Sequence, residues 1–445
     1  MKYTFSTYWP HYKATVKLGL PILIGQLGII ILGFADTLMV GRYNTDALAA
    51  AAFVNNLFTL VTFLLVGYSY GLTPLIGALY SRREYRHAGI IVKNALVSNF
   101  LFGGLLLLFM GILYFFLDEL GQPKELLPLI RPYYIVIYIS MFFVIFFNVF
   151  RQFADGTTHT AAAMWILLIG NGTNILFNYL LIYGIGPFPE MGLLGAGIST
   201  AGSRVLMVLI FIIFLLTSRR YRPYLVGFRT HCLKWKKVWH INKVSLPVAL
   251  QMGMETGSFT FSAVMVGWIS AVSLASYQII VTIGTLGFMF YYSIGASIAI
   301  RIAGYIGLND KVNVRIAAFS GCHILLIMAL CASTIFCTLG GNLIGLFSND
   351  PAVMSLALTL IIPLVAYQFG DAMQICFANA LRGTSHVISM MWIAFFSYLI
   401  VGIPTGYVLG FPLGWGEIGI FTSFSIGLFL AAILFFKQFM RVSRL

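Results

Sequence analysis

Charged residues are scarce in this chain. Asp, Glu, Lys and Arg together make up 9% of its 445 residues, whereas a soluble domain usually carries about 25%. Hydrophobic residues amount to 60% of the chain, and the mean hydropathy is +0.93. These figures exclude a cytosolic enzyme, a disordered chain and a secreted disulfide scaffold. They also disfavour a membrane β-barrel, because barrel strands alternate polar and apolar residues and give a much weaker hydropathy signal.

Cysteine is sparse as well. The chain has five cysteines: Cys232, Cys322, Cys331, Cys337 and Cys376. Their number is odd and none form a CxxC pair, so we expect neither a disulfide framework nor a cysteine-based metal site. A Walker A sequence is missing too, which argues against ATP as the energy source. We expect no cofactor.

Long apolar runs are what the chain has in abundance. A membrane-spanning helix needs about 20 apolar residues, so the composition allows about a dozen. Because unpaired backbone polar groups are costly in lipid, each run is predicted to be helical. We therefore predict an all-α integral membrane protein. Its twelve spans lie at about 16–40, 47–79, 88–117, 128–150, 160–184, 191–217, 243–269, 274–303, 314–347, 352–380, 386–410 and 416–437.

The few charges are distributed unevenly between the loops. If the N-terminus is cytoplasmic, every Lys and Arg lies on the cytoplasmic side except Arg42, Lys124, Arg131 and the mid-span Arg204. The opposite loops hold acids: Asp46, Asp118, Glu119, Glu125, Glu190, Asp350 and Glu417. This pattern follows the positive-inside rule and predicts a multi-pass protein with both termini in the cytoplasm. Topology thus accounts for the net charge of +14 without a nucleic-acid partner.

The sequence repeats itself after about 226 residues. The aligned pairs follow one another in order along both halves: Lys17 with Lys243, Pro21 with Pro247, Gly41 with Gly267, His159 with His386 and Gly195 with Gly419. Six spans per half is an even number, so both halves have the same orientation. We predict two parallel six-helix bundles, residues 1–217 and 243–445. A basic cytoplasmic linker, residues 218–242, joins them and rests on lipid headgroups.

Three acidic residues lie within predicted spans: Asp36, Glu255 and Asp371. Acids at this depth are costly and mark functional sites by default. At 1.5 Å per residue, Glu255 lies about 18 Å from Lys243, and Asp371 lies about 17 Å from Arg382. The two acids of the second half are therefore at matched depth. Such a pair can bind one Na⁺ or share one proton.

Polar residues accompany these acids at helical spacing. Gln251 with Glu255, and Tyr367 with Asp371, are each four residues apart and share a helix face. Asn174 and Asn178 form a similar pair in the fifth span. Amides of this kind either line a cavity or join helices through hydrogen bonds, and the sequence leaves both roles open.

Three other residues also have two interpretations. Arg204, in the sixth span, either pairs with an acid or is a structural cation facing the bundle, and we favour the structural role. Pro21 and Pro247 lie near the starts of equivalent helices, where proline removes a backbone hydrogen bond and kinks the helix. Each kink is either static or helps to convert ion binding into motion.

The chain resembles the multidrug and toxic compound extrusion (MATE) family, in particular its NorM-like bacterial branch. The resemblance covers nearly the whole chain. It rests on Lys17-x-x-x-Pro21 followed by Ala35-Asp36-Thr37-Leu38-Met39-Val40-Gly41, on Pro247 followed by Glu255, and on Asp371 ahead of Leu381-Arg382-Gly383. It implies two lobes around a central cleft in the bacterial inner membrane. It also implies an antiporter that exports organic cations in exchange for Na⁺ or H⁺ by alternating access. We expect a functional monomer, although the sequence does not settle the oligomeric state.

The resemblance also implies roles for individual residues. Glu255 and Asp371, with Tyr367 beside them, match the second-half site for the coupling ion, Na⁺ or H⁺. Asp36 matches the first-half acid. The predicted substrate cavity combines Asp36 with Asn174, Asn178, Thr200, Gln251 and Gln278. Some family members have an acid where Asn178 stands, so the first half of this chain departs from that pattern.

Other functions are weaker alternatives. A flippase for lipid-linked sugars, in the same superfamily, would need a cationic cavity for pyrophosphate, and Arg204 is the only mid-membrane cation found. An enzyme would need a metal or nucleophile cluster, and His323 is the only one of seven histidines clearly within a span. A channel is disfavoured because a parallel repeat with unequal acids favours alternating access. We predict that the chain is not an enzyme.

Overall fold

The computed structural model describes residues 5–230 and 233–444. Within these ranges all regular structure is helical, and eleven helical segments are long and apolar enough to cross a membrane. The helix α9, Trp235–Gly267, is a further long helix that is more polar, because it carries Lys236 and Lys237 near its start and Gln251 and Glu255 farther along. With α9 the predicted count of twelve is reached, and the all-α membrane architecture is confirmed. His231 and Cys232 lie outside the described residues.

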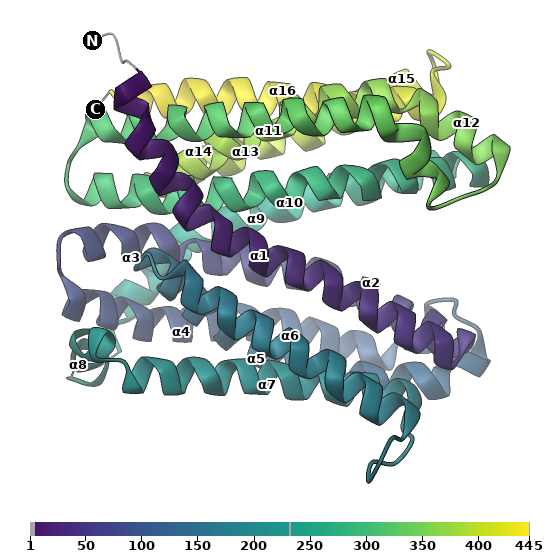
Figure 1. Cartoon of the computed structure of the whole chain (residues 1–445), viewed down its shortest axis with the longest axis horizontal. Helices are drawn as coiled ribbons and strands as arrows, with labels where there is room; N and C mark the ends of the chain where they lie inside the picture. Colours follow the sequence, from purple (N-terminus) through teal and green to yellow (C-terminus); the bar gives the residue numbers. More distant parts are fainter. Residues whose placement is uncertain (1–4, 231–232, 445) are drawn as a thin grey trace. The chain divides into compact units, whose positions relative to one another are not determined.

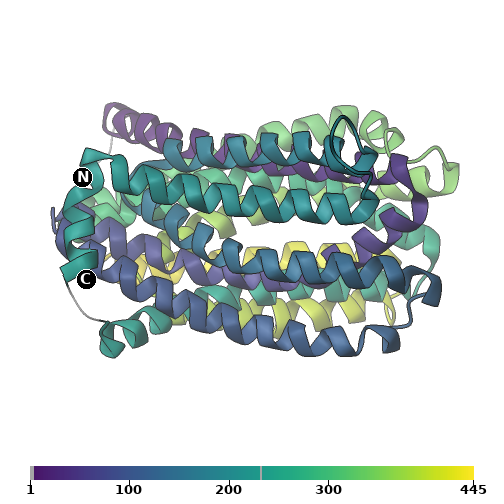
Figure 2. The same cartoon turned by 90° about the horizontal axis from the view of Figure 1, so that it is seen from below.

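The chain forms two compact units. The N-terminal unit comprises Ile24–Ser245, and the C-terminal unit comprises Met1–Leu23 with Leu246–Leu445. Within each unit, the long helices run roughly along one direction (Figures 1 and 2). This division differs from the predicted bundles 1–217 and 243–445, because residues 1–23 group with the C-terminal unit and residues 218–242 with the N-terminal unit.

Close backbone packing explains this division. In the C-terminal unit, a Cβ atom on Gly19 of α1 (Phe5–Tyr43) would lie 2.9 Å from Ile294 Cδ1. In the N-terminal unit, a Cβ atom on Gly71 would lie 2.4 Å from Ser245 Oγ of α9. Both α1 and α9 therefore begin in one unit and end in the other, and Gly19 and Ser245 are equivalent positions of the repeat. Only small residues allow contacts this close.

The remaining helices divide between the units in chain order. The N-terminal unit holds α2 (Thr45–Tyr70), α3 (Leu72–Ser81), α4 (Tyr85–Phe115), α5 (Leu127–Gly156), α6 (Thr160–Tyr183), α7 (Gly192–Thr217) and α8 (Arg222–Thr230). The C-terminal unit holds α10 (Ala271–Gly307), α11 (Lys311–Gly345), α12 (Pro351–Thr359), α13 (Ile361–Gly383), α14 (Val387–Ala394), α15 (Ile403–Gly410) and α16 (Gly416–Val442). A π-helical segment, Phe395–Gly402, joins α14 to α15.

The internal repeat extends to the backbone conformation. Among the described residues, four that are not glycine have positive φ: Arg83 (60°), Asn309 (57°), Thr158 (63°) and Ser385 (61°). They form two pairs, Arg83 with Asn309 and Thr158 with Ser385, at the sequence shifts of the repeat. Because the left-handed region is unfavourable for residues other than glycine, its recurrence at equivalent positions indicates that both halves have kept the same turns.

Helix starts repeat in the same way. Asn44 caps α2 by accepting a hydrogen bond from the Asp46 backbone N–H at 2.7 Å. Its equivalent, Ser270, caps α10 by accepting from the Ser273 backbone N–H at 3.0 Å. A side-chain oxygen at this position satisfies one of the unpaired N–H groups that begin every helix. The two halves therefore begin this helix with the same device but with different residues.

Several helix boundaries differ from the predicted spans. The helices α1 and α9 begin at Phe5 and Trp235, well before the predicted starts at 16 and 243, because their first turns carry polar residues. The predicted span 47–79 is broken at Gly71. Hydropathy alone detects neither feature, since a helix can extend beyond the lipid and a break at one glycine leaves the apolar run intact.

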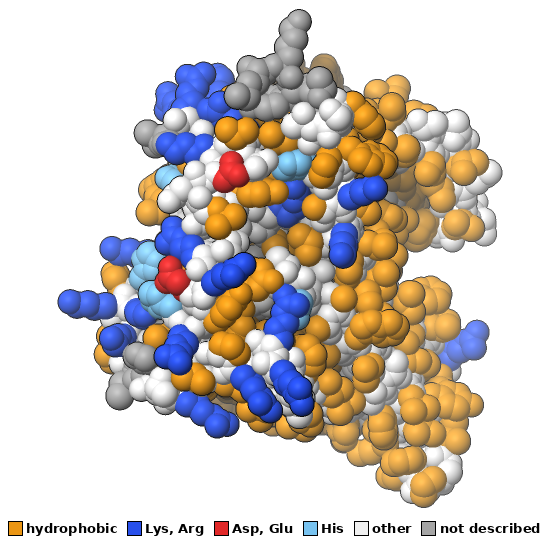
Figure 3. All heavy atoms as spheres, turned by 60° about the vertical axis from the view of Figure 1, so that its left-hand side comes forward, with side chains coloured by type: hydrophobic (Ala, Val, Ile, Leu, Met, Phe, Trp, Pro, Cys, Tyr) orange, Lys and Arg blue, Asp and Glu red, His pale blue; other side chains and the backbone are white. Residues whose placement is uncertain are grey.

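Basic side chains gather at the helix ends near α8. Figure 3 looks onto these ends and shows many Lys and Arg side chains, while hydrophobic side chains cover the helix flanks. The predicted linker 218–242 lies here and is mostly helical: it contains a 3₁₀ turn, Arg219–Tyr221, then α8 and the first turns of α9. The glycines Gly89 and Gly227 let α8 pack closely on α4, since a Cβ atom on either would lie 1.9 Å from a carbonyl oxygen of the facing helix.

Candidate coupling and substrate sites

The C-terminal unit brings two of the three predicted acids together. Glu255 lies on α9 and Asp371 on α13, close enough for their carboxylates to interact electrostatically. Asp371 is 1% exposed, and its Oδ2 has no hydrogen-bond partner. A buried carboxylate oxygen without a partner is rare, because its desolvation is not compensated. This atom is available to a proton or to a small cation.

Two glutamines bind Glu255. Gln251, one turn earlier on α9, donates to Glu255 Oε2 at 2.7 Å, which confirms that the two residues share a face. Gln374 of α13 donates to the same oxygen at 3.3 Å and to Tyr398 Oη at 2.6 Å. The Oε1 atoms of both glutamines are buried without partners. Unsatisfied acceptors therefore surround the Glu255 carboxylate, as they would around a cation site.

Sequence reasoning missed Gln374 and Tyr398. Gln374 follows Tyr367 and Asp371 by seven and three residues, so helical spacing places all three on one face of α13, and this spacing was the available signal. Tyr398 lies in the π-helical segment Phe395–Gly402. Segments of this kind are frequent at functional sites, but an apolar sequence does not reveal them.

Tyr367 lies beside the acids, as predicted from its spacing. It is 6% exposed and interacts electrostatically with Asp371 and Glu255. Its ring packs against Phe259 and Phe421, with centroid distances of 6.1 and 5.9 Å. Arg382, at the end of α13, interacts electrostatically with Glu255. In the sequence analysis this residue served only to estimate the depth of Asp371 in its span.

Gln278 is exposed on α10, and its backbone carbonyl accepts a hydrogen bond from Thr282 Oγ1 at 2.8 Å. Its place in a substrate cavity stays a prediction. Pro21 and Pro247 lie inside α1 and α9, which remain continuous helices through both residues.

Asp36 has a different environment, in the N-terminal unit. Asn178 of α6 donates from Nδ2 to Asp36 Oδ1. The amide of Asn174, oriented so that its nitrogen faces the carboxylate, donates to the same oxygen at 3.1 Å and accepts from Thr200 Oγ1 at 3.2 Å. Asn174 and Asn178 are fully buried, whereas Asp36 is partly exposed. The predicted polar partners of Asp36 thus surround it.

Glycines on α1 make this arrangement possible. A Cβ atom on Gly28 would lie 2.9 Å from Leu168 Cδ2 and 3.1 Å from Asn171 Nδ2 of α6, and one on Gly25 would lie 3.2 Å from Leu167 Cδ2. Residue numbers therefore increase in the same direction along the contacts of both helices, from the pair Gly25 and Leu167 to the pair Asp36 and Asn178. The two helices run parallel, which places the Asp36 carboxylate over the Asn178 amide.

Arg204 is held by α5. Its Nη1 donates to Ser140 Oγ and lies 3.6 Å from Met141 Sδ. It also interacts electrostatically with Asp36, although no ion pair between them is present among the described residues. These contacts are consistent with the structural role that we favoured for Arg204, which stays a prediction, and the guanidinium adds positive potential near Asp36.

A metal site of the usual kind is not present in the described part of the chain, where no group of three or more His, Cys, Asp or Glu side chains comes together. His323 contacts Tyr12 Oη through Nδ1 at 2.9 Å instead. Two carboxylates with amide and phenol oxygens, as found around Glu255, suit a weakly held monovalent cation. The Na⁺ ligand role of Glu255 and Asp371 stays a prediction.

Comparison with known proteins supports the fold and the repeat. A family model described as MatE matches the chain twice, at residues 21–180 and 247–408. The matches begin 226 residues apart (247 − 21), which is the shift of the repeat. The outward-facing structure of a multidrug resistance MATE family transporter superposes with a TM-score of 0.88 at 19% identity, covering 98% of this chain and 96% of that one. A crystal structure of MATE in complex with MaL6 gives 0.87 at 20% identity, covering 98% and 97%.

Named relatives span almost the full chain. It is 28% identical over 438 residues to a protein of Photorhabdus laumondii named probable multidrug resistance protein NorM, covering 96% of this chain and 95% of the relative. It is 27% identical over 429 residues to the protein of the same name from Acinetobacter baylyi, covering 96% of each. With two family-model matches that together span most of its length, the chain belongs to the MatE family of transporters.

Proposed function

We propose that the protein is a secondary active multidrug efflux antiporter, which exports organic cations in exchange for Na⁺ or H⁺ by alternating access. The observation that carries this proposal is the buried Asp371 carboxylate, whose Oδ2 has no partner and which lies within electrostatic reach of Glu255. Two carboxylates this deep need a positive charge between them. An ion that enters and leaves provides that charge in part of each cycle.

The same cluster supports coupling to either ion. A proton on one carboxylate removes the repulsion between the pair. Na⁺ does so as well, and finds carboxylate, amide and phenol oxygens from Glu255, Gln374 and Tyr398. In both cases the empty cluster is the high-energy form, so that ion entry at one side of the membrane drives the cycle.

Asp36 supports organic cations as the cargo. Its carboxylate is partly exposed and is oriented by Asn174 and Asn178, so it presents a fixed negative charge to a solute. The relatives from P. laumondii and A. baylyi carry the name probable multidrug resistance protein NorM. This name is consistent with organic solutes as substrates.

The flippase alternative is not favoured. It calls for a cationic cavity, whereas the deep cation Arg204 is bonded to Ser140, and the relatives are named for multidrug resistance. The many apolar helices support a multi-pass membrane protein. We place it in the bacterial inner membrane with both termini in the cytoplasm, because the basic residues then lie inside, and we take the monomer as the functional unit.

Transport by purified protein in proteoliposomes tests the proposal. Ethidium is the probe, and a Na⁺ gradient and a pH gradient are imposed separately. We expect ethidium movement under one of the two gradients and little without any. If neither gradient moves ethidium faster than liposomes without protein, the antiport proposal is wrong. Movement under only one gradient identifies the coupling ion.

A further inference from the structure

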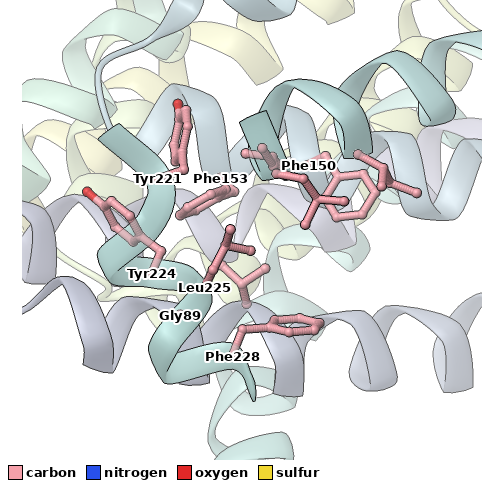
Figure 4. A pocket seen from close by; sticks show the side chains of 11 residues that line it. Gly89, Phe150, Phe153, Tyr221, Tyr224, Leu225 and Phe228 are labelled. Atoms are coloured by element: carbon pink, nitrogen blue, oxygen red, sulfur yellow. The ribbon is translucent and has the colours of Figure 1, made fainter. Parts of the chain in front are cut away.

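A pocket of about 260 Å³ lies between α4, α5, α7 and α8 of the N-terminal unit. Its walls are almost wholly apolar and include Val92, Phe150, Phe153, Leu216, Tyr224 and Phe228 (Figure 4). The hydroxyl of Tyr221, another wall residue, already forms a hydrogen bond with His159 Nδ1 at 2.9 Å. Drug-sized ligands usually occupy sites of about 300–1,000 Å³ with a few polar groups that orient them. This pocket is smaller and lacks such groups, so it suits a slender hydrocarbon.

The pocket opens toward the lipid-facing flank of α7. Two wall residues on this helix, Ile212 and Leu216, are 37% and 48% exposed. They adjoin Leu209 and Ile213, which are also exposed and apolar. An apolar surface of this kind, on a membrane helix, contacts acyl chains. An acyl chain lying along α7 can therefore enter the pocket without crossing a polar barrier.

Positive charge surrounds the same pocket at its α8 end. Arg219 lies two residues before the wall residue Tyr221 and Arg222 directly after it, and both are exposed. Arg220 donates to Tyr80 Oη at 2.8 Å, and the Lys93 ammonium lies 5.8 Å from the ring centroid of the wall residue Phe228. The two ion pairs found among the described residues involve other side chains. The arginines are therefore not neutralised by carboxylates.

We propose that this pocket binds one acyl chain of an anionic phospholipid, with the lipid phosphate at Arg219 and Arg222. The apolar walls fit the chain, and the arginines supply the complementary charge for the headgroup. The lipid would hold the connecting helix α8 against α4 and α7, with its headgroup in the leaflet at the basic helix ends. This inference does not depend on the transported substrate or on the coupling ion.

Native mass spectrometry of the full-length protein tests the lipid site. The probes are dioleoylphosphatidylglycerol and dioleoylphosphatidylcholine, which have the same chains and differ in charge. We expect one phosphatidylglycerol to bind about tenfold more tightly than phosphatidylcholine. Leu216→Trp, which fills the pocket, should abolish this binding. The matched control, Ile213→Trp, adds the same ring three residues earlier on α7, outside the pocket wall, and should bind as the wild type does.

The charge requirement is tested by the double variant Arg219→Gln with Arg222→Gln. We expect it to lose most of the preference for phosphatidylglycerol, while Arg441→Gln with Arg444→Gln, at the end of α16, keeps it. Equal binding of the two lipids by the wild type, or tight phosphatidylglycerol binding by Leu216→Trp, would overturn the proposal. So would displacement of the lipid by glycerol 1-phosphate, since that would indicate a phosphate site without an acyl-chain pocket.

Discussion

The acids of the two units are bonded in opposite ways. In the N-terminal unit, the single carboxylate of Asp36 accepts hydrogen bonds from the buried amides of Asn178 and Asn174. In the C-terminal unit, Asp371 has an oxygen without a partner and lies near a second carboxylate, Glu255. Amide donors stabilise the negative charge of Asp36, whereas two carboxylates within electrostatic reach of each other, one of them with a partnerless oxygen, favour an exchangeable cation between them. The repeat thus kept one scaffold and gave its halves different chemistry.

Removing either acid of the C-terminal unit should have the largest effect. We expect Asp371→Asn and Glu255→Gln each to reduce gradient-driven ethidium transport about 100-fold. Each substitution makes one of the two carboxylates neutral, so the pair no longer needs a cation to offset its repulsion. Gradient-driven flux in proteoliposomes measures this. Asp118→Asn, an exposed acid paired with Arg131, is the control and should transport normally. Wild-type rates in both site variants would remove the coupling role from the C-terminal unit.

Removing Asp36 should weaken transport less and in a different way. We expect Asp36→Asn to lower the apparent affinity for ethidium about tenfold, because the solute loses a charged partner, while transport still responds to the ion gradient. Initial rates over a range of ethidium concentrations separate affinity from maximal rate. A variant that keeps its ethidium affinity but no longer responds to the gradient would reverse the roles assigned to the two units.

The residues around Glu255 should have a smaller effect. We expect Gln374→Leu and Tyr398→Phe each to reduce gradient-driven transport at least about fivefold. The first removes the donor to Glu255 and Tyr398, and the second removes the hydroxyl that accepts from Gln374. Tyr407→Phe, at an exposed position of α15, is the matched control for the phenol. The same proteoliposome assay applies. If Tyr398→Phe is as active as Tyr407→Phe, the π-helical segment has no part in coupling.

These residues also indicate how much of the fold and of the site could be predicted from the sequence. Hydropathy predicted the helices, the 226-residue shift predicted the repeat, and the rarity of acids within spans singled out Asp36, Glu255 and Asp371. Spacing of four residues correctly placed Gln251 on the face of Glu255. The same kind of spacing from Asp371 could have indicated Gln374. Tyr398 was missed because its contact with Gln374 joins α13 to a π-helical segment, and a contact between distant helices leaves no periodic signal in one sequence.

The exchange of helix starts between the units was also beyond sequence reasoning. Residues 1–23 belong with the C-terminal unit because Gly19 packs tightly on α10. Neighbouring residues in a chain are normally assigned to the same bundle, and hydropathy carries no information about which bundle a helix contacts. The same holds for α8, whose close packing on α4 depends on Gly89 and Gly227, two glycines that look like ordinary positions in the sequence.

The last comparison is between two equivalent turns of the repeat, and it concerns how the stability of the protein depends on pH. His159 contacts Tyr221 of the connecting segment at 2.9 Å, whereas its repeat mate His386 contacts its own turn at the Thr384 carbonyl, 3.0 Å away. Burial, and then the nearby Arg220, lower the pKa of His159 below its usual 6.5. The folded protein therefore binds this proton less readily than the unfolded chain, and its stability is lost as pH falls from 6.5 through the lowered pKa.

We accordingly expect the melting temperature of the wild type to fall between pH 6.5 and pH 5, and His159→Asn to fall less over this range. Thermal unfolding of the detergent-solubilised protein, followed by circular dichroism at several pH values, measures the difference. Tyr221→Phe retains the buried ring but removes the hydroxyl that contacts His159, and it should keep most of the pH dependence because burial is the main cause of the pKa shift. Parallel curves for the wild type and His159→Asn would mean that this turn adds no pH dependence to the N-terminal unit.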